Sequence, residues 1–467
     1  MKRILIIVLS MLLVLSLCAC GEKAEETKTL RVGFGREEIT PQTPVLIAGG
    51  GNDDRISTGI LDYLYVTCVA ITDTEGNTAL ILTQDTVSSS EDFSITARDS
   101  ISKATGVPFE NIIIGATHTH SSGKLLGNAT GVPEFTANYF SKIVSAAQKA
   151  MEDRSPATVA MGNTRAEDLV FVRRYQLDDG TIKGARGNTS TSTTIVGHVW
   201  EANDTLQIVR FAREEKKDII LTGLGAHATF NGSTTQTNLS ADYPAGIRDY
   251  LEYNADCLVA HFIGAAGDQT PTTDIREEKH RMNYFAYGER IGEIVFNYLP
   301  NLTPVTDGQI RVTTQTLTAE SKKDDPTKVT EAKKLWDLFQ KEGFATAEKA
   351  AKEAGYAGIY DARAVVNHAT LPPSRDIIGT VIALGDMAFT AMPYEMHGGS
   401  ARELVESSAF GEKTFVITCA NGAEGYIPDA RGYEIGTYEA YTSYVVPGTG
   451  EKLVEMYLEM LSELKGQ

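Results

Sequence analysis

Short apolar runs alternate with segments of helical spacing along most of the chain. A short apolar run bounded by turn residues predicts a strand, and apolar positions three or four residues apart predict a helix. The predicted strands are 63–73, 78–85, 111–117, 205–212, 218–226, 257–265, 378–385 and 387–393. The predicted helices lie near 91–105, 135–152, 243–254, 282–299, 327–354, 396–407 and 448–465.

This mixture of strands and helices predicts an α/β fold with a mixed β-sheet core flanked by helices. The segment "DTEGN" (73–77) between two predicted strands is typical of a hairpin turn. The stretch 320–356 differs from the rest because it is charged and alanine-rich with helical spacing. We expect it to form a helical hairpin inserted between strands, which covers the surface and takes no part in chemistry.

The N-terminal residues predict export. "MKR" precedes an apolar run of 14 residues, which is too short for a membrane span and typical of a signal peptide. Leu17-Cys18-Ala19-Cys20 resembles a bacterial lipobox, in which Cys20 becomes the lipidated N-terminus; an ordinary secretory signal is the alternative. We therefore expect a signal peptide at 1–19, a charged tether at 20–29 and one folded domain at 30–467, outside the cytoplasmic membrane.

Charge and cysteine content narrow the class of protein. The net charge of −18, from 43 basic and 61 acidic residues, argues against nucleic acid and against broad adhesion to anionic lipid. Cys68, Cys257 and Cys419 are widely spaced and odd in number, so we interpret them as buried thiols rather than a disulfide framework.

Four predicted strands end in the same way, with an apolar run, a small residue and then a polar cluster. Ligand sites in α/β sheets form beyond the carboxyl ends of strands, so four such endings are expected to converge on one pocket. The endings are "GATHTH", "GLGAHATFNG", "FIGAAGDQTP" and "TAMPYEMHGG".

These endings carry candidate metal ligands. His118 and His120 would point to the same side of an extended chain, where both bind one metal or one of them faces substrate. Hydrogen-bonded histidines at a strand end are the alternative. His227 supplies a third imidazole, which favours zinc, since catalytic zinc sites keep three protein ligands and one open position. Glu395 is a hard ligand or a favourable charge at a helix N-terminus, and His397 is a rival ligand.

Six motifs in register resemble the catalytic domain of the neutral/alkaline (non-lysosomal) ceramidase family, or of bacterial lipoproteins related to it. The resemblance runs through most of the chain after the signal peptide. The motifs are "VGFGREEITPQ" with "IAGGG" and "TGILDYLYVTCVAITD", "ATHTHSSG", "AHATFNG" with "SADYPAG", "GAAGDQTPTT", "MPYEMHGGSAREL" and "GYIPDARGYEIGTYEA".

The resemblance implies a set of site residues. The family's zinc ligands fall on His118, His227, Glu395 and Tyr426. The second histidine of the H-T-H motif, His120, is implied to act on substrate. Tyr438 keeps the family's spacing of twelve residues from the first tyrosine. The family's arginine falls on Arg173 or Arg174, and Arg173 is favoured.

The chain also departs from the family pattern. Thr270 stands where the family has serine. Threonine keeps the hydroxyl but adds a methyl group and restricts rotation about χ1. If that hydroxyl meets substrate, the change suggests a different substrate. We expect no counterpart of the family's C-terminal immunoglobulin-like domain, and 320–356 has no counterpart that we can place.

The expected function is that of a zinc-dependent amide hydrolase, ceramidase-like, which uses Zn²⁺ to activate water and is anchored to the bacterial membrane through Cys20. Its partner is a lipid-like or other N-acylated small molecule. His120, Arg173 or Tyr438 would stabilise the oxyanion, and His120 or Tyr438 would protonate the leaving amine; Thr270 completes the expected site. Another zinc deacylase or esterase, or a non-catalytic lipoprotein that binds amphiphiles, are the alternatives.

Overall fold

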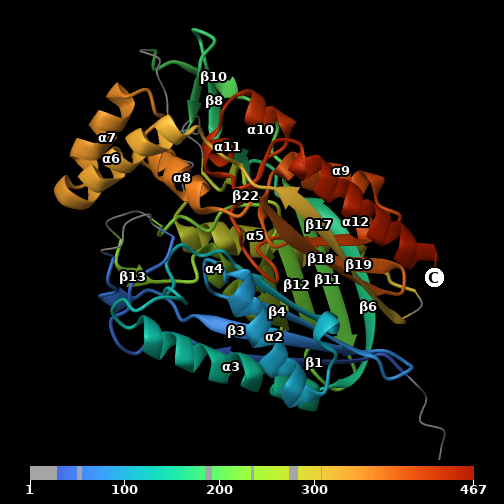
Figure 1. Ribbon diagram of the computed structural model, residues 1–467. Coiled ribbons are helices and arrows are strands. Elements are labelled where there is room, and N and C mark those ends of the chain that lie inside the picture. Colours follow the sequence, from blue (N-terminus) through green and yellow to red (C-terminus); the bar gives the residue numbers. More distant parts are fainter. Residues whose placement is uncertain are drawn as a thin grey trace, which may run out of the picture.

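The computed structural model describes residues 29–49, 55–184, 192–232, 236–272, 282–306 and 308–466 (Figure 1). The expected signal peptide and Cys20 lie outside these residues. No helix in the described part of the chain has the length and apolar character needed to cross a membrane.

A mixed β-sheet carries the N-terminal and central parts of the chain. Its strands are β1 (Arg31–Glu38), β3 (Tyr65–Thr72), β4 (Thr78–Gln84), β5 (Ile112–Ala116), β6 (Ser155–Arg165), β11 (Thr205–Arg213), β12 (Ile219–Leu224), β14 (Leu258–Ile263) and the short β16 (Thr303–Pro304). They follow the order β14-β12-β11-β6-β1-β3-β4-β5, with β16 paired to β6. The pairs β4–β5 and β12–β14 are parallel and the other pairs are antiparallel.

The central strands are buried on both faces, which explains why they read as continuous apolar runs. In β3, Val66 and Cys68 face one core cluster, whereas Val69 and Ile71 face another.

The sheet also curls, which brings together strands that are not neighbours in the strand order. The Thr83 hydroxyl of β4 donates to the carbonyl of His261 in β14 at 2.6 Å. Ala116 at the end of β5 and Ile263 at the end of β14 share a small buried cluster, and the N–H of Gly264 after β14 donates to the carbonyl of Leu224 at the end of β12 at 3.0 Å. The carboxyl ends of these three strands therefore lie close together.

A second sheet packs against the first. It contains β17 (Ile310–Glu320), β18 (Ser374–Leu384), β19 (Met387–Ala391) and β21 (Thr414–Ile417), in that order. The Phe415 ring lies between the two sheets, with its centroid 5.9 Å from that of Phe262 and 5.6 Å from that of Phe389. These rings belong to the core cluster between the sheets.

Helices cover the outer faces of both sheets and give a four-layer α/β/β/α arrangement (Figure 1). This confirms the predicted α/β class with a mixed sheet. Helices α2 (Glu91–Thr105), α3 (Val132–Glu152), α4 (Tyr243–Asn254) and α5 (Tyr284–Tyr298) cover the first sheet, and α9 (Gly398–Ser407) and α12 (Thr449–Gly466) cover the second.

The charged stretch 320–356 contains two helices, and a third helix follows it. Helices α6 (Pro326–Glu342), α7 (Phe344–Glu353) and α8 (Ile359–Thr370) bury a small core of their own. The break after α6 falls at Gly343, whose φ of 82° lies in the left-handed region that glycine adopts at low cost. Helix α8 was not predicted.

The remaining elements are short and lie around the strand ends. Two-residue pairs join β2 (Gly59–Ile60) to β13 (Asn238–Leu239), β7 (Phe171–Val172) to β15 (Gln269–Thr270) and β20 (Glu395–Met396) to β22 (Tyr426–Ile427). A small sheet holds β8 (Arg174–Leu177), β9 (Ile182–Gly184) and β10 (Ile195–His198), and α10 (Ala430–Glu434) and α11 (Tyr438–Thr442) follow β22.

Candidate functional site

The four polar strand endings meet in one place, as the sequence predicted. The backbone N–H of Gly267, after β14, donates to the carbonyl of Met396 at 2.8 Å. The N–H of His120, after β5, donates to the carbonyl of Ala228, after β12, at 3.1 Å. These contacts join segments that follow β5, β12, β14 and β19, each of which belongs to a parallel pair.

His118 and His120 approach each other by a different route from the one predicted. The backbone of His118 has φ 61°, in the left-handed region, so the H-T-H segment is not an extended strand. The Nδ1 atom of His118 lies 2.5 Å from the carbonyl oxygen of Val87, and Nδ1 of His120 lies 2.8 Å from that of Gly49. The two Nε2 atoms are 3.3 Å apart.

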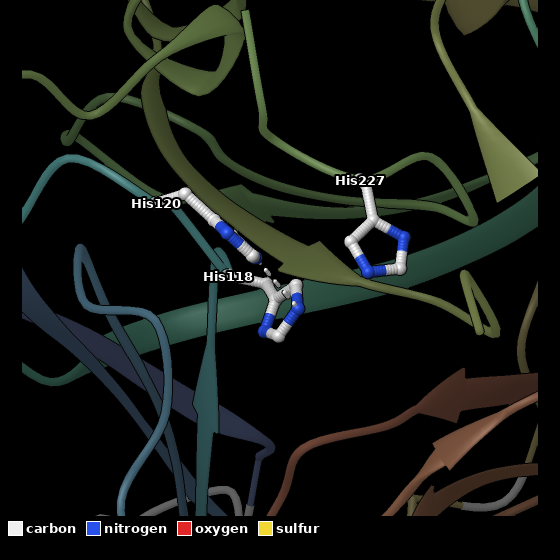
Figure 2. A group of neighbouring side chains, drawn as sticks. All are labelled: His118, His120 and His227. Carbon is white, nitrogen blue, oxygen red and sulfur yellow. Dashed lines mark hydrogen bonds between the residues drawn. The ribbon is translucent and has the colours of Figure 1, made fainter. Parts of the chain in front are cut away.

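His227 completes the group. Its Nδ1 atom lies 3.0 Å from the carbonyl oxygen of Gln269, in the polar segment after β14. Figure 2 shows the rings of His118, His120 and His227 around a common space. Ligand nitrogens of the three side chains lie within 4.8 Å of one another, so the group is able to hold a metal ion.

Glu395 reaches the same space from β20. Its Oε2 atom lies 3.0 Å from Nε2 of His227 and 3.4 Å from Nε2 of His118. Burial alone favours the protonated carboxyl, but the imidazoles of His118 and His227 hold the pKa of Glu395 well below its usual range. The site therefore contains a carboxylate.

The charge state of the imidazoles suits a cation site. Burial, together with the neighbouring His118 and His227, holds the pKa of His120 well below its ordinary value. Burial and Arg173 lower the pKa of His227. Burial alone would also lower the pKa of His118, but Cys419 and Glu395 outweigh it and raise that pKa. The local potential around His118 therefore favours a positive charge.

The donor set fits a metal ion such as zinc. Each histidine has its Nδ1 atom against a carbonyl oxygen, which fixes the N–H there and leaves the Nε2 lone pair for a metal. Four tetrahedral ligands at about 2.0–2.1 Å from zinc are about 3.3 Å apart. The separations of 3.0 and 3.4 Å from Oε2 of Glu395 to Nε2 of His227 and of His118 are close to that value. Nε2 of His120 lies beside the same point, 3.3 Å from that of His118.

The backbone of Tyr426 places this residue next to Glu395. Glu395 and Tyr426 are direct partners in the parallel β20–β22 pair. The ring centroid of Tyr426 lies 5.8 Å from that of Tyr438. Burial, reinforced by the charge of Glu395, raises the pKa of Tyr426 well above its ordinary value. Its phenol is therefore neutral unless a nearby cation stabilises the ionised form.

The structure separates the two candidate arginines. The Arg173 guanidinium carbon lies 5.5 Å from the ring centroid of Tyr426 and 6.0 Å from that of Tyr438, so Arg173 faces the site. Arg174 instead donates to the carbonyl of Arg173 at 2.7 Å and pairs with Glu439.

Two further candidates lie beside the group. Thr270 pairs with Phe171 across β15–β7, and it follows Gln269, whose carbonyl holds His227. The hydroxyl of Thr270 lies 3.4 Å from that of Thr272. His397, the rival ligand, is fully buried with its Nδ1 atom 3.2 Å from a carboxylate oxygen of Asp429.

Several residues that support the site were not predicted from sequence. Glu439 binds both arginines, and Asp268 accepts from the N–H of Gly398 at 2.8 Å at the start of α9. Cys419 places its sulfur 3.7 Å from Nδ1 of His118. Only Glu439 had a usable signal, because it follows Tyr438 directly in a motif that the resemblance had already singled out.

Comparisons with known proteins agree on the fold. Neutral ceramidase from Pseudomonas aeruginosa matches with a TM-score of 0.70 at 13% sequence identity, over 94% of this chain and 75% of that chain. A ceramidase complexed with C2 matches with a TM-score of 0.71 at 15% identity over the same shares. No protein-family model matches the sequence, and no curated protein matches it either. The chain thus has the fold of neutral ceramidase, as the motif resemblance implied.

Proposed function

We propose that the chain is a zinc-dependent amide hydrolase that acts on an N-acylated, lipid-like amine. The observation that carries the proposal is the convergence of His118, His120, His227 and Glu395, with every imidazole fixed through Nδ1. The shared fold with neutral ceramidase supports the substrate class, since that protein's name states an amide substrate.

The proposed zinc ligands are His118, His227, Glu395 and Tyr426. Zinc, when bound, supplies Lewis acidity and lowers the pKa of a coordinated water towards 7. The protein contributes a carboxylate and imidazoles, which bind a metal in their deprotonated forms, so His118 releases a proton when the metal binds. Tyr426, beside Glu395 in β22, becomes a ligand only when its phenol ionises.

The neighbouring side chains would handle substrate. His120 retains an Nε2 atom on the metal side and is placed to accept or return a proton. Arg173 and Tyr438 adjoin Tyr426, and their donors would stabilise negative charge that develops on the carbonyl oxygen. One such donor typically contributes about 2.7–4 kcal/mol to the transition state.

The test is metal content and hydrolysis, measured together on purified protein lacking residues 1–20. We expect about one zinc per chain and release of fatty acid from a short-chain ceramide. His118→Ala should lose both zinc and hydrolysis. His261→Ala is the matched control, because His261 is a buried histidine bound to Thr222 in the sheet. Full zinc content in the His118 variant would contradict the proposed ligand set.

We also propose a second candidate function, that of another deacylase or an esterase, because Thr270 stands where the ceramidase motif has serine. A panel of N-acylated amines and matching esters, with and without a sphingoid base, would separate a ceramidase from another deacylase or an esterase. Preference for ceramide supports the main proposal. Hydrolysis of the other acylated amines or esters alone would assign the chain to that second class.

We also propose that Cys20 carries a lipid anchor, on the basis of the lipobox-like Leu17-Cys18-Ala19-Cys20. Labelled palmitate should be incorporated into the full chain and not into the Cys20→Ser variant. Incorporation in both, or in neither, would reject this anchor.

A further inference from the structure

A buried ion group lies directly behind the candidate site. Glu439 is fully buried, in the first turn of α11, and contacts two arginines. Removing three charged groups from water is costly, and apolar residues of similar size are often at least as stabilising. Stability alone therefore does not explain why these three charged side chains are buried together.

The contacts of Glu439 fix the orientation of one guanidinium. Its Oε1 atom accepts from Nε of Arg173 at 2.8 Å and from Nη2 at 2.6 Å, and its Oε2 atom accepts from Arg174. Nη2 of Arg173 also donates to the carbonyl of Gly267 at 2.7 Å. One edge of the Arg173 guanidinium is thus held by a carboxylate and a backbone carbonyl.

The opposite side of Arg173 faces the site. Its guanidinium also hydrogen-bonds to Tyr426, and burial is outweighed by Glu439 and Tyr426, so that its pKa is raised and the group stays charged. The backbone N–H of Arg173 donates to the carbonyl of Asp268 at 2.9 Å, which ties it to the segment that also carries Gln269. One carboxylate against two arginines leaves one positive charge, and Arg173 presents it to the site.

We propose that Glu439 is a positioning residue, which holds Arg173 so that its free donors face Tyr426, Tyr438 and the reacting carbonyl. Glu439 makes no contact of its own with substrate and acts through Arg173. This inference rests on the proposed hydrolase function, and it adds a residue to which neither the motifs nor the comparisons gave a role.

Kinetics on a double-mutant cycle test the coupling. Glu439→Gln keeps the shape but removes the charge, and kcat should fall about 100-fold, the usual effect of misplacing a catalytic group by about 1 Å. KM should change little, because the lost interaction belongs to the transition state. In the Arg173→Met background the same change should have no further effect on kcat/KM. If the two single-variant losses in kcat/KM multiply in the double variant, Glu439 does not act through Arg173 and has a merely structural role.

Matched variants separate position from folding. Glu37→Gln removes a carboxylate that pairs with Lys142 and Lys149 of helix α3, and it should leave kcat unchanged. If Glu439→Gln fails to fold, Glu439→Asp keeps the charge and should give a smaller loss of kcat. An unchanged kcat in a folded Glu439→Asp or Glu439→Gln protein would overturn the proposal.

A readout without turnover keeps this inference distinct from the proposed function. In protein labelled with ¹⁵N-arginine, Nε–H of Arg173 should exchange slowly, and its signal is assigned by its loss in Arg173→Met. Glu439→Gln should broaden or shift that signal strongly. An unchanged signal would reject the positioning role even in a protein that hydrolyses no ceramide, whereas a lost signal with no hydrolysis by the wild type would reject only the proposed reaction.

Discussion

The three imidazoles of the candidate centre share one hydrogen-bonding scheme. Each Nδ1 atom meets a backbone carbonyl, of Val87, Gly49 or Gln269, and each Nε2 atom is left for the common space. Backbone carbonyls cannot accept a proton at ordinary pH, so the tautomer is set by the fold rather than by a titrating neighbour. The site depends on loop backbones as much as on its ligands.

Gly49 offers a direct test of this dependence. It has φ 88°, and a Cβ atom at this position would lie 2.6 Å from Cγ of His120. Gly49→Ala should displace the His120 ring and lower kcat about 100-fold while zinc content stays near that of the wild type. Activity assays and metal analysis on the same samples check this.

The control for Gly49 is Gly76→Ala. Gly76 also has a positive φ, of 96°, but a Cβ atom there would have no neighbour within 4 Å. The Gly76→Ala variant should lose stability through backbone strain but keep the kcat of the wild type. A Gly49 variant that loses zinc as well would indicate that His120 is itself a metal ligand.

Most residues of the candidate site could be named from the sequence, but the contacts and backbone conformations that orient them could not. His118, His120, His227, Glu395 and Arg173 were named from motifs and from the resemblance, and the structure gathers them. The left-handed backbone of His118 could not be anticipated, because histidine rarely adopts it and only tertiary contacts stabilise it there.

At the scale of elements, helix α3 is fixed to strand β1 by charge and by glycine. Gly33 and Gly35 leave no room for a Cβ atom, which would lie 2.0 Å from the carbonyl oxygens of Ala150 and Ala146. Glu37 then binds Lys142 at 2.9 Å and Lys149 at 2.7 Å on the same helix.

This ion pair predicts a pH effect. Burial opposes ionisation, but Lys149, Ser145 and Lys142 lower the pKa of Glu37 from 4.5 to about 2. A depressed pKa stabilises the folded state above pH 4.5, and that contribution is lost as the pH falls towards 2. Glu37→Gln should cost about 1 kcal/mol at pH 7, since both lysines are partly exposed. Urea unfolding at pH 7 and pH 3 should show the difference shrinking; a constant difference would contradict the assignment.

Strands buried on both faces were predicted well and amphipathic ones were missed. Strand β3 was found because its apolar run is continuous, whereas β1 and β17 mix glycine, arginine or threonine with apolar residues and gave no clear run. Helix α2 was predicted to its ends, where Ser90 accepts from the N–H of Phe93 and Gly106 follows with φ 75°. Within the predicted helical region 327–354, the break between α6 and α7 falls at Gly343.

At the scale of the whole molecule, aromatic rings pack within the core between the two sheets. Phe415 of β21 meets Phe262 of β14 and Phe389 of β19, and a Cβ atom at Gly223 would lie 2.9 Å from its Cζ atom. These ring contacts could not be predicted from sequence, because contacts between sheets join segments that are far apart in the chain.

Phe415→Ala should therefore destabilise the whole fold by about 3–5 kcal/mol, the usual cost of such a cavity. Denaturant unfolding followed by fluorescence and by circular dichroism should shift together. The control is Phe296→Ala, since Phe296 of α5 is 38% exposed and its loss should cost less than about 1 kcal/mol. A small effect at Phe415 would mean that the sheets are held mainly by other contacts.

The spread of the site along the chain has a consequence for how the protein is made. His118 follows β5, whereas Glu395, Tyr426 and Glu439 come about three hundred residues later, in β20, β22 and α11. Contacts between such distant segments form late, because loop closure must precede them. A growing chain therefore cannot complete the centre before its last quarter is synthesised. With the proposed ligand set, acquisition of zinc should report the final step of folding, and truncated chains should show no hydrolysis.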